Sequence, residues 1–289
     1  MKQLRVIKKI AMYLMLAIVL LYFLGPVLWL LLSSIQPEDE LTAVPPKWIP
    51  EKITLDNYYA FFDKNLRDKL HVPGVASEVV SSLLNSTIIA MFVTIISLSI
   101  AIPAAYTFAR YSSKILSFWY VIILLFRLVP AVAIVIPFYV IMKNMGLLGN
   151  FSSVIIAHTT FTLPFIVWVL RGFFCAIPVD IEEAALIDGC TKFGAIIRVV
   201  LPVVVPGIIA SAVFAFMFSW NEFFFSLILT SASRIKTIPV VSALFASDML
   251  LKHGIMNAEA IVAIIPPIFF ALIFSSYLRK GLASGSVVG

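Results

Sequence analysis

Residues 83–108 of the chain read LLNSTIIAMFVTIISLSIAIPAAYTF and hold no Asp, Glu, Lys or Arg. A transmembrane helix needs about 20 largely apolar residues, so this stretch is long enough to cross a bilayer. The whole composition agrees, because hydrophobic residues make up 62% of the 289 residues and charged residues only 12%. A water-soluble chain of this length could not bury so much apolar surface. We therefore expect a membrane protein.

Further stretches have the length and composition of membrane spans, and each predicts a helix. The expected spans are residues 10–32, 83–108, 117–142, 154–174, 203–229 and 260–277. Pro266 and Pro267 interrupt the last span and predict a kink or a break there. The sequence thus predicts an all-α, polytopic membrane protein with about six transmembrane helices.

The basic residues of the short loops predict the orientation, because Lys and Arg are enriched on the cytoplasmic side. With the N-terminus inside, the cytoplasmic segments hold Lys2, Arg5, Lys8, Lys9, Arg110, Lys114, Arg171, Lys192, Arg198, Arg279 and Lys280. The short outer loops hold Lys143, Arg234, Lys236 and Lys252. Both termini are therefore expected in the cytoplasm, and the first span is expected to stay as an uncleaved anchor because no small-residue cleavage site ends it.

Residues 33–82 form one long loop, which this orientation places on the periplasmic or extracellular side. It carries the acidic run Glu38-Asp39-Glu40, five prolines and a group of aromatic residues between Trp48 and Phe62. Two interpretations stay open for it. The loop is either a small helical cap that touches an extracytoplasmic partner or a solvated connector.

Residues 175–202, between the fourth and fifth spans, form a polar cytoplasmic loop with clear helix signals. Asp180 followed by Glu183 matches a capping box, which predicts a helix start. Gly189 can adopt the left-handed conformation that ends a helix. A second short helix is expected over residues 191–200, before Leu201-Pro202 opens the fifth span.

So short a first helix is not stable alone and needs something to pack on. Ala184 and Ala185 are expected to expose a nearly flat surface, with carboxylates around it for charge-assisted contacts. The alternative is an amphipathic helix lying on the membrane, but such helices usually carry large aromatic and basic side chains. The contrast favours docking of a partner protein.

The spacing in this loop resembles the EAA motif of ABC-importer permeases. Glu183-Ala184-Ala185 is followed after three residues by Gly189, after nine more by Val199, and then by Leu201-Pro202. The usual motif has isoleucine where this chain has Val199. Other stretches resemble the carbohydrate-importer branch, specifically its MalG-like second permease. They are residues 85–86, 104–110, 163–174, 219–223 and the glycine-rich end at 281–289, where Val288 replaces a common lysine.

The resemblance implies a type I ABC-importer permease fold, with residues 1–289 as a single transmembrane permease domain in the plasma or inner membrane. It implies the following partners: a second, different permease, two ABC ATPase subunits and an extracytoplasmic sugar-binding protein. ATP and Mg would be bound by the ATPase, and this chain indeed has no Gly-rich phosphate-binding loop. The implied function is ATP-driven import of a sugar, a saccharide or a polyol. The residues expected to dock the ATPase are Glu183, Ala184, Ala185, Asp188, Gly189, Leu201 and Pro202.

Arg127 and Glu222 are the formal charges expected well inside the spans, where ionisable groups usually face a bundle interior or a water-filled cavity. Asn221 precedes Glu222, so the two are expected on different sides of one helix. Either could lie on the solute pathway and bind sugar hydroxyls. Alternatively Glu222 pairs with Arg127 in an internal polar clamp. His158 reads more readily as a hydrogen-bonded packing residue than as a proton relay.

Other functions fit the sequence less well. The net charge of +6 is spread over short loops, which suits contact with membrane lipid and predicts no nucleic-acid partner. The three histidines and two cysteines form no metal-ligand spacing. An ion-coupled secondary transporter would use His158 or Glu222 but would have no role for the EAA-like loop. An intramembrane enzyme would need a nucleophile with a base, or paired aspartates, at one depth.

Overall fold

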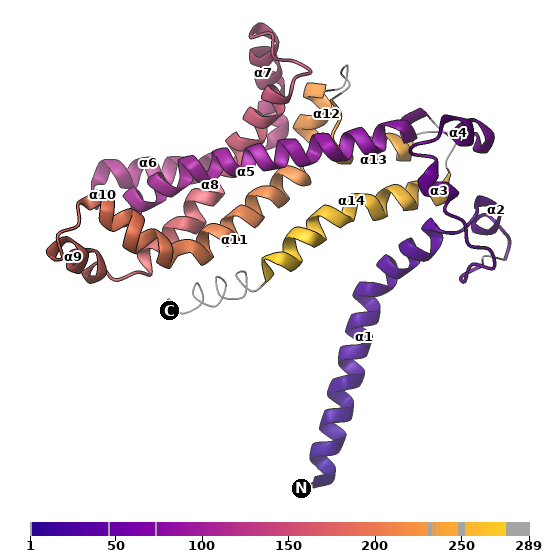
Figure 1. Cartoon of the computed structure of the whole chain (residues 1–289), viewed down its shortest axis with the longest axis horizontal. Coiled ribbons are helices and arrows are strands. Elements are labelled where there is room, and N and C mark those ends of the chain that lie inside the picture. The colour runs from indigo at the N-terminus through magenta and orange to yellow at the C-terminus, as the bar shows by residue number, and fades with distance from the viewer. Residues whose placement is uncertain are drawn as a thin grey trace. The chain divides into compact units, whose positions relative to one another are not determined.

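The computed structural model describes residues 2–45, 47–72, 74–230, 233, 235–247 and 252–275. Every regular element in these ranges is helical (Figure 1). The elements are α1 (Lys2–Ser34), α2 (Glu38–Leu41), α3 (Asp56–Tyr59), α4 (Lys64–Leu70), η1 (Gly74–Glu78), α5 (Val79–Arg110), α6 (Lys114–Leu125), η2 (Phe126–Leu128), α7 (Ala131–Asn144), α8 (Phe151–Cys175), α9 (Asp180–Ile187), α10 (Lys192–Ala195), η3 (Ile196–Val200), α11 (Leu201–Trp220), α12 (Phe224–Thr230), α13 (Ile238–Ser247) and α14 (His253–Ile273). Arg234, Arg279, Lys280 and the glycine-rich end lie outside the described residues.

Five of the described helices are long and apolar enough to cross a membrane, and one bent pair would make a sixth. The five are Lys8–Ser34, Gly74–Arg110, Phe151–Cys175, Lys192–Trp220 and His253–Ile273. The predicted all-α polytopic architecture is therefore confirmed.

The third predicted span, residues 117–142, is not straight. Residues Lys114–Leu128 and Ala131–Asn144 form two helices bent by 99°. Val129 between them is extended, with φ −73° and ψ 124°, and Pro130 precedes α7 as its N-cap. Proline disfavours helical backbone in the residue before it, which accounts for the break at this point.

The fifth and sixth spans also differ from expectation. The prediction of one helix over 203–229 is wrong, because α11 ends at Trp220 and α12 begins only at Phe224. Of the kink or break predicted at Pro266 and Pro267, the break does not occur, since α14 runs helically through both prolines. A helix remains the simplest way to pair backbone groups inside a membrane even where proline removes one donor.

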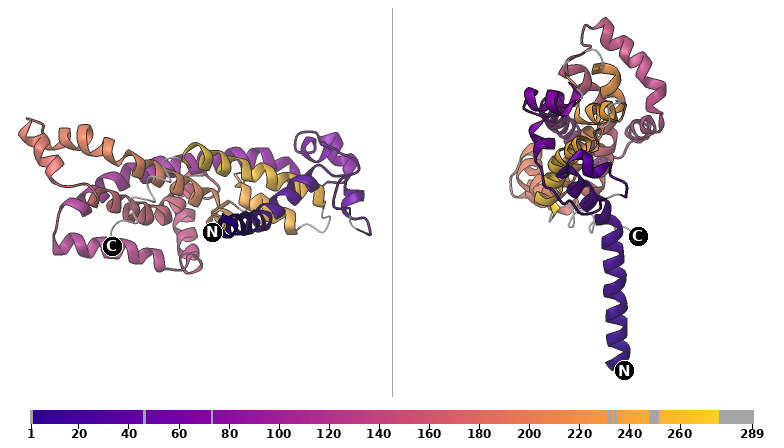
Figure 2. Two further views of the ribbon diagram at one scale, coloured as in Figure 1. Left: turned by 90° about the horizontal axis from the view of Figure 1, so that it is seen from below. Right: turned by 90° about the vertical axis from the view of Figure 1, so that its right-hand side faces the viewer.

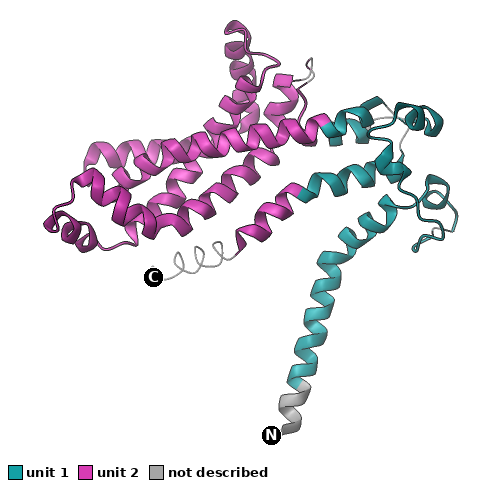
Figure 3. Cartoon of the chain, viewed as in Figure 1, with its two compact units in different colours: residues 1–80, 241–265 teal, residues 81–240, 266–289 magenta. Residues whose placement is uncertain are grey.

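The chain divides into two compact units, residues 1–80 with 241–265 and residues 81–240 with 266–289 (Figure 3). In the second unit α8 packs against α11. Gly207 makes this possible, because a β carbon there would lie 2.4 Å from the ring of Phe173. One apolar cluster gathers Leu170 and Phe174 of α8 with residues of α5 and α11, and another surrounds Phe225 of α12.

The first unit begins with α1, a single long helix seen from the side in Figure 2. None of its apolar window is buried against other parts of the chain. A helix that is apolar on all sides needs lipid or a membrane partner around it.

Residues 33–82, called the cap below, are folded and are not a solvated connector. They contain α2, α3, α4 and η1. The Asn57 side chain is buried and its Nδ2 donates to the backbone oxygens of Ser34 at 2.9 Å and Gln36 at 3.0 Å. The side-chain amide thus closes the segment onto the end of α1.

Two carboxylates complete the cap. Glu40 is 4% exposed, and its oxygens accept from the backbone N–H groups of residues 51 and 52 at 3.0 and 3.1 Å. Glu38 accepts from the backbone N–H groups of residues 253 and 254, both at 3.0 Å. Glu38 therefore supplies acceptors to N–H groups that the first turn of α14 leaves without helical partners.

Candidate functional site

The helix α9 begins differently from the capping-box prediction. Its N-cap is Val179, and no side chain caps it. Asp180 is the first helical residue, so its carboxylate cannot act as the predicted cap. Asp180, Glu182 and Glu183 all lie in the first turn, where negative charge is favoured by the helix dipole.

The end of α9 confirms the predicted role of Gly189, whose φ is +88°. The Gly189 N–H donates to Leu186 O at 3.1 Å, and the Cys190 N–H donates to Ala185 O at 3.0 Å. This pair of bonds is a Schellman motif, which needs a left-handed residue at the Gly189 position. A β carbon there would meet nothing within 4 Å, so only the backbone conformation demands glycine.

Residues 175–202 are called the elbow below, and the second helix of this elbow continues into the fifth span. Thr191 caps α10 by accepting from the Gly194 N–H at 3.1 Å, as expected for a start at this point. The chain then passes through the π-helical turn η3 directly into α11, with Pro202 in the first turn. Proline supplies no N–H to the preceding turn, where the wider π geometry occurs. The second helix of the elbow is therefore the N-terminal part of the fifth span.

The predicted flat surface of two alanines is only half correct. Ala184 is exposed, but Ala185 is 7% exposed because α9 packs against α10 and η3. Of the other expected docking residues, Glu183, Asp188, Gly189 and Pro202 are exposed and Leu201 is half-buried. Leu201 packs against the apolar cluster around Phe174.

Apolar side chains that sequence reasoning did not single out complete this surface. Ile187 is 86% exposed and Phe193 is 72% exposed. Both lie within a few residues of the Gly189 turn, and Leu186, which precedes Ile187, is 39% exposed. Their signal was present in the sequence, since large apolar residues inside a polar loop need a reason to be there.

Glu182 holds the elbow to the end of α5. Its carboxylate forms an ion pair with the Arg110 Nε and accepts from the Tyr106 hydroxyl at 2.9 Å. Arg110 Nη1 also donates to Phe174 O at 3.0 Å. The sequence offered a partial signal, because Tyr106 and Arg110 are four residues apart and share one helix face.

Asn221 and Glu222 do not lie on one helix, so that prediction is wrong. Asn221 is the C-cap of α11, and its Nδ2 donates to Met217 O at 2.8 Å. Glu222 accepts from the N–H groups of Phe225 at 2.8 Å and Ser226 at 3.0 Å. The two residues thus finish one helix and begin the next.

His158 of α8 is buried and lies beside this break. Its Nδ1 is 2.8 Å from Ser219 Oγ, and its Nε2 is 3.0 Å from Ser226 Oγ. The same Nε2 is 2.9 Å from Glu222 Oε2. His158 is therefore buried and hydrogen-bonded, as the packing interpretation predicts.

The pairing of Arg127 with Glu222 is wrong in this structure. The Arg127 guanidinium lies over the rings of Phe165 and Phe218, 4.4 and 5.0 Å from their centroids. A polar clamp does exist around Glu222, but His158 supplies it. A third charged residue, Glu259, lies inside a membrane-length helix, α14. It is buried and accepts from Ser242 Oγ at 2.7 Å.

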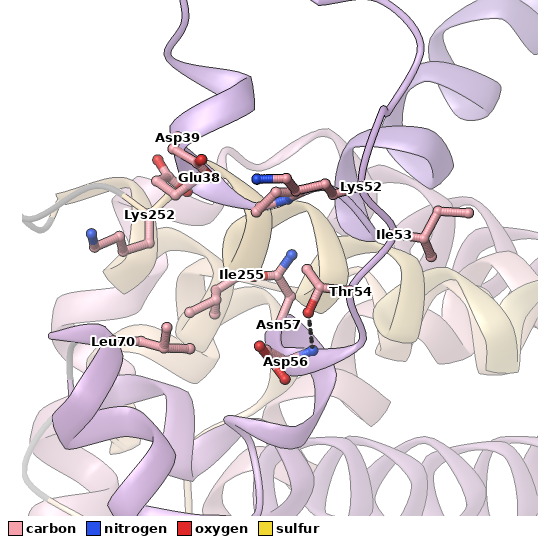
Figure 4. Close-up of a pocket in the computed structure, with 11 residues that line it drawn as sticks. Glu38, Asp39, Lys52, Ile53, Thr54, Asp56, Asn57, Leu70, Lys252 and Ile255 are labelled. Carbon is pink, nitrogen blue, oxygen red and sulfur yellow. Dashed lines mark hydrogen bonds between the residues drawn. The ribbon is translucent and has the colours of Figure 1, made fainter.

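An open pocket of about 410 Å³ lies between the cap and the start of α14 (Figure 4). Its lining contains the carboxylates of Glu38, Asp39 and Asp56 and the amines of Lys52 and Lys252. The two signs of charge leave no preference for a cation or an anion. Among the residues that the structure describes, no group of three His, Cys, Asp or Glu could hold a metal ion.

Comparison with known proteins agrees with this arrangement. Residues 97–284 match the family described as the binding-protein-dependent transport system inner membrane component. The chain is 32% identical over 273 residues to the sulfoquinovosyl glycerol transport system permease protein SmoH of Agrobacterium fabrum, covering 94% of this chain and 92% of that one. It is 34% identical over 270 residues to the trehalose transport system permease protein SugB of Mycobacterium tuberculosis, covering 93% of each.

A solved structure shows the same fold. It is a crystal structure of a bacterial ABC transporter involved in the import of the acidic polysaccharide alginate. The TM-score is 0.74 at 21% identity, over 94% of this chain and 96% of that chain. The fold is that of an ABC-importer permease.

The helical spans and the elbow define a multi-pass membrane permease, not an enzyme. The chain belongs to the family of inner membrane components of binding-protein-dependent ABC importers. Membership implies an ATPase and a solute-binding protein as partners.

Proposed function

We propose that this chain is the second permease subunit of an ATP-driven sugar importer. Residues 1–289 serve as one permease domain that pairs with a different permease and forms half of the translocation pathway. Residues 175–202 lie in the cytoplasm with both termini, and the cap lies on the outer side. ATP and Mg are bound by two ATPase subunits, of which one docks on the elbow.

The observation that carries this proposal is the exposed apolar surface beside the Gly189 turn. Ile187 and Phe193 are 86% and 72% exposed, in a segment that also carries exposed charged residues. Exposed apolar groups of this kind mark a protein contact. The exposed carboxylates of Glu183 and Asp188 flank them and offer charge-assisted hydrogen bonds to basic side chains of a partner.

A sugar is proposed as the solute because the relatives named above carry sugar derivatives. We place the solute pathway beside the break at 221–223. Asn221 is exposed there. Its Nδ2 donates to Met217 O, and among the described residues no group bonds to its Oδ1, which could accept from a sugar hydroxyl. The Glu222 carboxylate is already bonded to His158 and to the first N–H groups of α12. Its role is therefore to fix the break between α11 and α12.

The test is co-purification of the full importer from membranes, using this chain as bait. We expect the ATPase subunits and the second permease to be recovered, with ATP hydrolysis stimulated by the binding protein loaded with its sugar. Ile187→Asp should lower ATPase recovery by about tenfold, as for loss of an interface residue worth more than 1 kcal/mol.

Ile49→Asp is the matched control, because Ile49 is 77% exposed but lies in the cap. It should leave ATPase recovery unchanged. Equal losses in the two variants would contradict docking on the elbow. Failure to recover any ATPase with the unaltered chain would overturn the proposed function itself. The comparisons do not favour an ion-coupled secondary transporter, which would take up its solute without an ATPase.

A further inference from the structure

The contacts of Arg110 raise a question about how the elbow moves other helices. The elbow is joined covalently to α8 and α11, its neighbours in the chain. It is not directly joined to α5, because α6, η2, α7 and α8 lie between them in the chain. Arg110 and Glu182 are 72 residues apart. α5 can follow a movement of the elbow only through non-covalent contacts.

Glu182 provides such a contact, and it is largely shielded from solvent. The side chains of Arg110 and Glu182 are 7% and 12% exposed, so bulk water screens the pair only weakly. Tyr106, one turn earlier on α5, donates to the other carboxylate oxygen at 2.9 Å. Two side chains of α5 therefore hold one side chain of α9.

The same guanidinium fixes the end of α8. Arg110 Nη1 donates to Phe174 O at 3.0 Å, one of the last carbonyls of a helix that have no intrahelical donor. In return, Arg171 Nε of α8 donates to Phe108 O of α5 at 3.1 Å. The ends of α5 and α8 therefore cap one another, and Glu182 of α9 is bonded to this joined pair of helix ends.

The remaining carboxylates of the elbow are not anchored. Asp180, Glu183 and Asp188 are exposed, and within the described part of the chain Glu182 alone among these four makes an ion pair. Glu182 thus faces inward toward α5, whereas the others face outward to a partner. Glu182 and Glu183 are adjacent in sequence, but only Glu182 is held by α5.

We propose that Arg110 and Glu182, with Tyr106, form the linkage that transmits movement of the elbow to α5. In this role Arg110 is a positioning residue. The inference rests on the proposed function, because it assumes that an ATPase moves the elbow. Breaking the linkage should leave the ATPase docked and active but should disconnect ATP hydrolysis from solute transport.

The test uses the intact importer in lipid vesicles with the variants Glu182→Gln, Arg110→Gln and Tyr106→Phe. We expect normal recovery of the ATPase, continued ATP hydrolysis and about a tenfold lower transport per ATP for the first two, equivalent to about 1.4 kcal/mol of lost coupling. Tyr106→Phe should have a smaller effect. The double variant Arg110→Glu with Glu182→Arg should recover part of the loss.

A second measurement separates transmission from simple folding. Spin labels on Cys introduced at Ser112, two residues after the end of α5, and at Asp180 report the distance between the end of α5 and α9. The chain for this measurement has Cys175 and Cys190 replaced by Ser. The distance should stay constant on ATP binding when Glu182 is present and should change in Glu182→Gln.

Either of two results would overturn the inference. One is unchanged transport per ATP in Glu182→Gln, and the other is loss of ATPase recovery in parallel with transport. Absence of any ATPase with the unaltered chain would instead reject the proposed function.

Discussion

The cap and the elbow both adjoin ends of membrane-length helices, but they are held in different ways. The cap is closed by side-chain bonds to backbone groups, from Asn57, Glu38 and Glu40. The elbow has one charged anchor, Glu182, and exposes Ile187 and the Gly189 turn. The difference indicates that the cap is built to keep its shape, and it supports the proposal that the elbow is held by a partner and moved as a unit.

The largest effect on stability is expected for Gly254→Ala, in the first turn of α14 where it contacts Asn57 of the cap. A β carbon at Gly254 would lie 2.7 Å from Asn57 Nδ2, and Asn57 cannot retreat because it is bonded to two backbone oxygens. Overpacking should lower the free energy of unfolding by about 3 kcal/mol, measured as the midpoint of unfolding in detergent. Gly74→Ala is the control, since its β carbon would meet nothing within 4 Å. Equal losses would show that the cap is not tightly held.

Glu40→Gln tests the carboxylate inside the cap. The backbone N–H groups of residues 51 and 52 bond to its two oxygens, and glutamine offers only one acceptor. The unpaired buried donor should cost about 2 kcal/mol, seen as faster hydrogen exchange in the cap. Glu51→Gln is the control because its pair with Lys47 is exposed. Unchanged exchange in Glu40→Gln would remove Glu40 from the set of cap anchors.

Gly189→Val should act on the elbow through the backbone alone. Its φ of +88° is unfavourable for a β-branched residue, at a cost of roughly 1–2 kcal/mol. We expect weaker ATPase association and less transport, with membrane insertion intact. Gly172→Val is the control. It introduces the same side chain at a position where a β carbon meets nothing within 4 Å and φ is not left-handed. Transport at the unaltered level in Gly189→Val would reject the assigned role of the turn.

The smallest effect is expected for the exposed pair of Lys47 and Glu51. The hydrogen bond that Lys47 Nζ donates to the Glu51 carboxylate raises the pKa of Lys47 above its ordinary value of 10.5. A raised pKa in the folded state means that any stability from this pair is present below pH 10.5 and is lost as the pH rises through the folded pKa. Because exposed pairs contribute little, Lys47→Met should not shift the unfolding midpoint at pH 7. A clear shift would show that the cap depends on its surface as well as on its buried bonds.

Local features could be predicted from the sequence where one residue type decides them. Long apolar stretches predicted the helices, Gly189 predicted the end of α9, and the EAA-like spacing predicted the family. These signals depend on neighbours within a few positions along the chain. The break between α11 and α12 gave no such signal, because Phe223 and Phe224 continue the apolar pattern without glycine or proline.

Long-range pairs could not be predicted. Arg127, His158 and Glu222 all lie within apolar stretches, and the sequence does not say which of them share a depth. Charge alone favoured Arg127 as the partner of Glu222, but the rings of Phe165 and Phe218 hold that guanidinium. For the same reason no pattern in the sequence joins Glu182 to its partner Arg110, which is 72 residues away.

The continuity of the elbow with the fifth span has a mechanical consequence. Lys192–Trp220 is a single run of 29 residues, which at about 1.5 Å per residue makes a rod of about 44 Å. If its elbow end is the pivot, a tilt of about 5° displaces the far end by about 4 Å, by simple leverage on that length. The far end is Trp220, next to the break that His158 and Glu222 hold in place. A movement too small to remodel the elbow is therefore amplified to the width of a water molecule or more at the opposite end.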